Sequence, residues 1–181
     1  MNRFLILGPF FLVSGCGVLF GNIKPVEEKS ESYHIEDLSK QDPDWIKLDA
    51  AQEQALDPET TTNPDISDVA FQSKKTSSII SLNSACRKVS PPNQDLQSFT
   101  RELFLGISDV TVHDEYPFQV QNSPALQTTI RGKMGDEQMM LRAVVLHRNF
   151  CTYDLMYVAR PEHFTEQEQF FSQFVQSLRL K

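Results

Sequence analysis

The chain has 181 residues, of which 17 are basic and 24 acidic, giving a formal net charge of −7. This length suits a single domain and is short for two. The acidic balance disfavours nucleic acid as a partner, because proteins that bind phosphate backbones usually carry an excess of positive charge.

The chain begins with a short positively charged segment that contains Arg3, followed by an apolar run over residues 4–13. Ten residues are too few to span a ~30 Å hydrocarbon core as a helix. They have the length and order of the charged and apolar regions of a secretory signal. The run leads through small residues into "LVSGC", which ends at Cys16 and resembles the lipobox of bacterial lipoproteins.

This resemblance implies that Cys16 is the lipidation site. Its thiol would carry a diacylglycerol, the signal peptide of residues 1–15 would be removed, and the new amino terminus would be acylated in turn. Three acyl chains would make attachment to the membrane effectively permanent. The residue after Cys16 is Gly17. In this family an aspartate at that position retains the protein in the inner membrane, so glycine suggests the outer membrane, with the domain facing the periplasm. The alternative is an ordinary signal peptide or an apolar terminus that happens to contain a cysteine.

Removal of the signal, whose one charged side chain is Arg3, leaves 16 basic and 24 acidic residues and a formal charge of −8. Residues 16–42 are polar and rich in charge, without a sustained apolar period, and are predicted to form a flexible tether. A single domain is expected over residues 43–181. Its first apolar cluster, Trp45 to Leu48, predicts a short edge strand or turn, and the Pro-, Asp- and Asn-rich stretch up to Asp68 predicts a loop, with a weak helix at residues 50–56.

Two strands and a helix are predicted next. Val69 and Phe71 precede a turn at residues 74–76, and the following residues alternate up to Cys86, which indicates a hairpin. Pro91 and Pro92 end it. Asn93 or Asp95 is a candidate N-cap for a helix that Gly106 would stop. The apolar positions at helical spacing are Leu96, Phe99, Leu103 and Phe104.

The second half predicts an antiparallel meander and a closing helix. "VTVHDEYPFQVQ", "PALQTTIRGKM", residues 139–148 and residues 152–159 each read as a strand, with a turn around Gly135-Asp136. "MMLRAVVLH" is apolar at nearly every position and is predicted to be a central strand covered on both faces. A helix over residues 165–178 shows a capping-box pattern at Thr165 and Glu168. Its apolar stripe consists of Phe170, Phe171, Phe174, Val175 and Leu178.

This order predicts an α+β fold, an antiparallel sheet of about six strands covered by two helices. Three segments carry a resemblance to the PsbP-like α/β/α sandwich, found in the photosystem extrinsic protein PsbP and in small bacterial lipoproteins: "DVAFQSKKTSSIISLNSACR", "LRAVVLHRNFCTYDLMYVARPEHF" and "FFSQFVQSLRL". The resemblance implies a fold and leaves the function open, because one scaffold hosts many roles. No metal-binding or photosystem-binding motif of that family matches here residue by residue.

Cys86 and Cys151 remain once Cys16 is assigned to lipid, and an even pair in an oxidising compartment predicts a disulfide. Both lie at predicted strand ends, where their Cα atoms could come within bonding distance. The alternative makes Cys151 a nucleophile activated by His147, with Asp154 as its orienting carboxylate. On one strand, residues 147 and 151 would lie ~13 Å apart, which disfavours this triad unless a turn intervenes.

No cofactor and no metal site are expected. The histidines His34, His113, His147 and His163 show no ligand spacing. Asp109, Asp114 and Glu115 near His113, and Glu102, are best explained as solvated charges, as are Lys74 and Lys75 at the hairpin turn. Four aromatic residues could line an apolar pocket between sheet and helix, although core packing is the commoner role: Tyr116, Phe118, Tyr153 and Tyr157.

The sequence therefore predicts a membrane-anchored, non-enzymatic periplasmic lipoprotein whose small domain binds a protein partner or an envelope component. The alternatives are a carrier of a small apolar ligand between sheet and helix and, third, a thiol enzyme.

Overall fold

The computed structural model describes residues 33–49, 68–86 and 95–181. The predicted signal peptide, Cys16, the weak helix at residues 50–56 and the Pro91-Pro92 pair lie outside these ranges.

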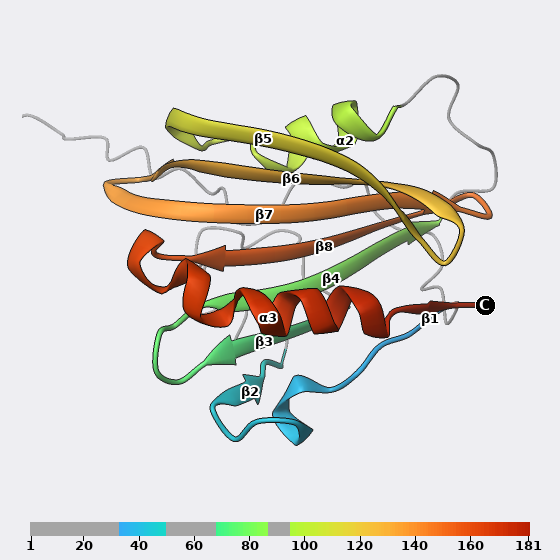
Figure 1. Ribbon diagram of the computed structural model, residues 1–181, viewed down its shortest axis with the longest axis horizontal. Helices are drawn as coiled ribbons and strands as arrows, with labels where there is room; N and C mark the ends of the chain where they lie inside the picture. The colour runs from blue at the N-terminus through green and yellow to red at the C-terminus, as the bar shows by residue number, and fades with distance from the viewer. Residues whose placement is uncertain (1–32, 50–67, 87–94) are drawn as a thin grey trace, which may run out of the picture.

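A large antiparallel sheet forms the middle of the molecule, as the sequence predicts, with seven strands (Figure 1). From edge to edge the order is β2 (Trp45–Lys47), β3 (Val69–Ser73), β4 (Ile79–Cys86), β8 (Cys151–Ala159), β7 (Glu137–Arg148), β6 (Ser123–Met134) and β5 (Ser108–Val120). A separate two-stranded sheet pairs β1 (Tyr33–His34) with β9 (Arg179–Leu180). The helices are α2 (Leu96–Leu103), α3 (Pro161–Ser177) and a short 3-10 turn, η1 (Leu38–Lys40).

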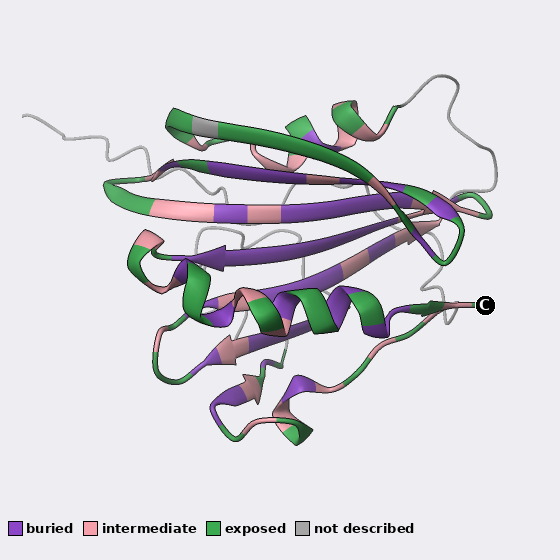
Figure 2. Ribbon diagram, viewed as in Figure 1, coloured by how far each residue is buried: buried purple, intermediate pink, exposed green. Residues whose placement is uncertain are grey.

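The two helices cover opposite faces of the sheet. Phe171 and Phe174 of α3 pack on a core that includes Phe71 and Tyr157. On the other face, Leu103 of α2 packs on a smaller core built from β6, β7 and β8. The sandwich with two helices is therefore confirmed. Figure 2 shows β8 buried along its length and β5 exposed along most of its length.

The predicted central strand, β7, is indeed covered on both faces, but β8 occupies the middle of the sheet. β8 alternates so that Tyr153, Leu155 and Tyr157 face α3, while Met156 and Val158 face α2. A strand in this position needs apolar residues on both sides, which explains why its burial is nearly continuous.

Helix α3 begins at Pro161, four residues before the predicted capping box, so that prediction is wrong. Proline suits the first helical position, because its missing N–H is one that the helix cannot satisfy there. Arg160 is the N-cap residue and makes no side-chain capping bond. Thr165 is an exposed residue inside the helix, and Glu168 forms an ion pair with Arg142 of β7.

A buried polar network fixes α3 to the two strands at the sheet edge. The Asp44 carboxylate accepts hydrogen bonds from Ser73 Oγ at 2.7 Å and Gln167 Nε2 at 3.3 Å, and Gln167 Nε2 also lies 2.9 Å from Ser73 Oγ. All three side chains are buried. Because buried polar groups are costly when unpaired, this network favours one position of the helix over the sheet.

Residues 33–42, which the sequence assigns to the tether, pack against the domain. Tyr33 pairs with Leu180, the Glu36 amide donates to Ser177 Oγ at 3.1 Å, and Leu38 is fully buried. The globular domain therefore starts at least ten residues earlier than its predicted boundary at residue 43.

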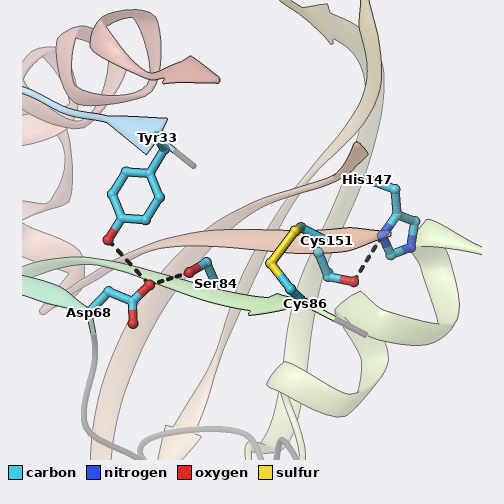
Figure 3. The surroundings of a disulfide bond; sticks show 7 residues. Tyr33, Asp68, Ser84, Cys86, His147 and Cys151 are labelled. Carbon is cyan, nitrogen blue, oxygen red and sulfur yellow. Dashed lines mark hydrogen bonds between the residues drawn. A yellow bond between two sulfur atoms is a disulfide. The ribbon is translucent and has the colours of Figure 1, made fainter. Parts of the chain in front are cut away.

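A disulfide joins Cys86 at the end of β4 to Cys151 at the start of β8 (Figure 3). The two residues are directly opposite each other in the antiparallel pair, with their Cα atoms 4.0 Å apart. The bond closes a loop of 65 residues. In the chain-entropy model, such a loop stabilises the folded state by about 4 kcal/mol.

We expect the double variant Cys86→Ser/Cys151→Ser to lower the free energy of unfolding by 2–5 kcal/mol, a range typical of native disulfides. Urea unfolding monitored by the fluorescence of the buried Trp45 would measure the change. Wild-type protein under reducing conditions should lose about as much stability as the variant. A variant as stable as the oxidised wild-type protein would show that the β4–β8 pairing holds without the cross-link.

Candidate functional site

The predicted thiol triad is not assembled. Cys151 is half of the disulfide, so its sulfur is not a thiolate nucleophile. Its side chain points to the α3 face of β8, whereas Asp154 lies on the α2 face, because alternate residues of a strand face opposite ways. His147 pairs with Thr152 across β7 and β8, and its Nδ1 lies 2.9 Å from the Thr152 hydroxyl. The three side chains therefore do not share a site.

The histidines for which contacts are described lie on separate elements. His113 on exposed β5 lies 3.2 Å from Glu115, and His163 on α3 lies 3.5 Å from Glu166. Over the described ranges, no three His, Cys, Asp or Glu side chains come together in a group that could hold a metal ion.

The four aromatic residues proposed to line a pocket fall into two pairs. Tyr153 and Tyr157 are buried beneath α3, where the Tyr157 ring stacks on Phe164 and burial raises its pKa to about 12. Tyr116 and Phe118 instead stack on each other on β5, with ring centroids 6.4 Å apart. Tyr157 and Tyr153 are thus part of the core, and Tyr116, which is 65 % exposed, belongs to the surface.

A hydrogen-bonded cluster around the Asp68 carboxylate lies beside the disulfide. Asp68 accepts hydrogen bonds from the hydroxyl groups of Tyr33, at 3.2 Å, and of Ser84 (Figure 3). Burial, with a contribution from the Asp68 charge, raises the pKa of Tyr33. The cluster fastens β1 to the start of β3 and the end of β4, so the chain enters the domain next to the cross-linked strands.

Asp154 is a buried carboxyl group that the sequence did not single out on its own account. Asn83 Nδ2, on the neighbouring strand, donates to its Oδ2 at 3.0 Å, and its Oδ1 has no hydrogen-bond partner among the described residues. Burial raises its pKa to about 7, with a smaller contribution from the charge of Asp68. The group is thus neutral in mildly acidic solution and becomes a buried charge above neutral pH.

Strand β5 is an exposed edge. Its described side chains from Ser108 to Pro117 are all exposed, and no other described strand pairs with its outer side. The turn to β6 contains Gln121 and Asn122, both with positive φ, which is the geometry of a two-residue type I′ hairpin. Val120 and Ser123 therefore form a hydrogen-bonded pair, and every second residue back from Val120 directs its backbone groups toward β6.

Pro117 then falls among the residues whose backbone groups point to the open edge, where a missing N–H costs no ladder bond. Asp114 and Glu115 add charge, and the register shifts between Ser108 and Val112. Proline, charge and an irregularity are the features by which edge strands avoid pairing with other chains. The contact surface that β5 offers is therefore its side chains, with the Tyr116-Phe118 stack as the apolar part.

A second exposed surface lies where the hairpin turns meet. We call it the turn end. Gln121 connects its parts, because its carbonyl oxygen accepts from Arg148 at 3.5 Å and its side chain accepts from the Leu180 amide at 2.7 Å. The turn end comprises Gln121, Asn122, Arg148, Asn149, Phe150, Arg179, Leu180 and Lys181.

Phe150 is the unusual residue of the turn end. Its φ is +67°, in the left-handed region, and 62 % of the side chain is exposed. An L-residue with a Cβ costs about 1–2 kcal/mol in that conformation, which glycine adopts readily. Because the Phe150 side chain is largely exposed, its packing contributes little free energy to offset this cost. Backbone strain of this kind, without a packing reason, is a basis for a functional hypothesis.

No protein-family model matches the chain, and no curated protein matches it either. Among solved structures, the cyanobacterial PsbP (CyanoP) of Synechocystis sp. PCC 6803 superposes with a TM-score of 0.52 at 11 % identity, covering 88 % of this chain and 99 % of that one. The protein of unknown function PA94 of Pseudomonas aeruginosa gives a TM-score of 0.48 at 13 % identity, covering 87 % and 89 %. The PsbP likeness supports the predicted fold.

None of the helices in the described ranges is long and apolar enough to cross a membrane.

We expect stability to fall with rising pH through the titration of Asp154. Because the folded pKa is about 7 and the ordinary value 3.8, the folded state binds the extra proton between these limits. The loss should approach about 1.4 kcal/mol per pH unit from pH 4 to 7 and level off above. Urea unfolding across pH 4–9 should show this decline in wild type and not in Asp154→Asn. The exposed Asp136→Asn is the matched control, and its pH profile should follow wild type. Parallel wild-type and Asp154→Asn profiles would contradict the assignment.

We expect Phe150→Gly to raise the free energy of unfolding by about 1 kcal/mol, because glycine relieves the left-handed strain and little packing is lost. The same substitution at Asn149, which has φ +49° and a side chain that tolerates this region, should change stability less. Thermal or urea unfolding would measure both. A destabilised Phe150→Gly would mean that the exposed ring makes contacts on which the fold depends.

Proposed function

We propose that this chain is a lipid-anchored protein of the bacterial cell envelope, without enzymatic activity, whose α+β domain binds a protein partner through the outer flank of the sheet. Acylation at Cys16, removal of residues 1–15 and exposure to the periplasm, with the outer membrane as the expected location, are parts of this proposal. They rest on the lipobox resemblance.

The observation that carries the proposal is the exposure of β5. α3 packs over β3, β7 and β8, which leaves β5 uncovered on the same face. Tyr116 and Phe118 extend the aromatic face of the sheet beyond the helix. A stacked aromatic pair rimmed by polar and charged groups is the composition found at the centres of protein interfaces. The unpaired backbone N–H and C=O groups of β5 contribute less to partner binding, because Pro117 has no N–H to donate.

The two alternative functions, a thiol enzyme and a carrier of an apolar ligand, have less support from the described residues. The candidate nucleophile Cys151 is oxidised in a disulfide, and the candidate base His147 and orienting acid Asp154 lie on the opposite face of the sheet. The space between sheet and α3, where an apolar ligand would bind, is filled by rings in mutual contact: Tyr157 lies 4.8 Å from Phe164 and 5.7 Å from Phe171, centroid to centroid.

Site-specific photo-crosslinking in cells tests the binding surface. We expect a photoreactive phenylalanine at Tyr116 of the full chain to capture one discrete protein, identified by mass spectrometry, and Tyr116→Ala to weaken binding of that protein by at least tenfold. The same probe at Gln169, exposed on α3, is the matched control and should not capture it. Equal capture at both positions, or none at Tyr116, would contradict the binding surface. Cys16→Ser should abolish incorporation of labelled palmitate into the protein, and undiminished incorporation would contradict the anchor.

A further inference from the structure

We propose that the turn end is a membrane-docking surface, in which Phe150 enters the headgroup region of an anionic bilayer while Arg148, Arg179 and Lys181 bind lipid phosphates. The orientation part rests on the proposed anchor at Cys16. The binding part stands on the described residues alone.

Phe150 is placed as an interfacial anchor would be. It lies at the tip of the β7–β8 hairpin, is 62 % exposed, and keeps a backbone conformation that glycine would adopt at lower cost. The next residue, Cys151, is cross-linked to β4, so the tip stands on a covalently fixed base. A rigid support means that little conformational freedom is lost when the ring inserts.

The turn end has the charge that an anionic surface requires. Its eight residues include three cationic side chains and no carboxylate side chain, in a protein whose formal charge is −7. Arg148 and Arg179 donate to backbone carbonyls of Gln121, Gln176 and Leu178, which hold the guanidinium groups at the surface. Each basic residue near an anionic membrane strengthens binding by roughly fivefold.

The position of the amino-terminal segment fits this orientation. The chain enters the described domain at Tyr33, whose partner in the β1–β9 pair is Leu180 of the turn end. Sixteen residues lie between Cys16 and Tyr33 in the sequence. If they behave as the predicted flexible tether, their average span is about 20–25 Å. An acylated Cys16 would therefore keep the turn end, of all parts of the domain, nearest to the membrane.

A membrane suits this surface better than a protein. Large exposed apolar side chains in the described part of the chain are Leu105, Val110, Tyr116 and Phe150, and Phe150 alone of these belongs to the turn end. A stable protein interface needs about 800 Å² from each partner around an apolar centre. One ring surrounded by cations falls short of that, yet it matches the pattern of residues that hold proteins in the headgroup layer.

Vesicle co-sedimentation of the full chain with Cys16→Ser tests docking without any acyl chain. We expect binding to vesicles of phosphatidylglycerol and phosphatidylethanolamine, little binding to phosphatidylcholine alone, and weakening in 0.5 M NaCl because salt screens exposed charges. Adding Phe150→Gly should weaken binding about tenfold, although that variant is expected to be at least as stable as wild type. Neutralising Arg148, Arg179 and Lys181 to Gln together should weaken it more than tenfold.

Leu105→Ser is the matched control, because Leu105 is 64 % exposed and precedes the end of β5 that pairs with Lys133, at the opposite end of the sheet. It should bind vesicles as well as its parent. Undiminished binding by Phe150→Gly, equal binding to neutral vesicles, or no binding by the Cys16→Ser chain would overturn the proposal. A protein partner at this end would be indicated if Phe150→Gly lost capture of a protein while vesicle binding was absent.

A tryptophan at position 150 gives an independent reading. The one native tryptophan, Trp45, is 1 % exposed, so its emission provides a constant background. Phe150→Trp should shift its emission to the blue on anionic vesicles and be quenched by brominated lipids, whereas an unshifted spectrum would overturn insertion. If the mass of the native protein shows no acyl chains while this shift occurs, the anchor fails and the docking surface stands.

Discussion

The antiparallel pairing of β4 with β8 holds the molecule together. It joins the strands from the first part of the domain to the meander that follows α2, through eight residue pairs from Ile79–Val158 to Cys86–Cys151. Neither half could cover its apolar faces alone, because α3 packs across strands from both. Long-range pairing carries a loop-closure cost that local hairpins avoid. The disulfide at the end of this ladder offsets that cost where β4 and β8 would otherwise fray.

The same arrangement leaves two surfaces free. The sheet has seven strands and each helix covers only part of one face, so most side chains of β5 stay exposed although Gln97 of α2 donates to Glu115. Because β5 to β8 form an antiparallel meander, the turns of β5–β6 and β7–β8 lie at the same end of the sheet, beside β1 and β9. One surface is acidic and carries a stacked aromatic pair, and the other is basic and carries a strained phenylalanine. Partner binding and membrane docking are thus assigned to different residues.

The alternating and helical patterns predicted most of the elements correctly, since β3, β4, α2 and β6–β8 bury regular faces of their own sequence. Contacts made only by the tertiary fold escaped prediction. The β1–β9 pair involves two residues from each end of the domain, and nothing local marks it. The sequence suggested Asp154 only as the orienting carboxylate of a thiol triad, and its burial follows from the central position of β8 in the folded sheet. The two-residue turn requires positive φ at Phe150, but the residue preferences of such turns favour asparagine and glycine, so they do not predict phenylalanine there. The cations of the turn end come together from residues far apart in sequence.

We propose that lipid on Cys16 holds this disulfide-linked domain at a membrane. The most direct test is the intact mass of the protein extracted from membranes, after free thiols are alkylated without reduction. We expect the mass of residues 16–181 plus acyl chains, with no alkyl group on Cys86 or Cys151. A mass that retains residues 1–15, or that lacks acyl chains, would contradict the anchor, and an alkylated Cys151 would contradict the disulfide at the end of the β4–β8 ladder.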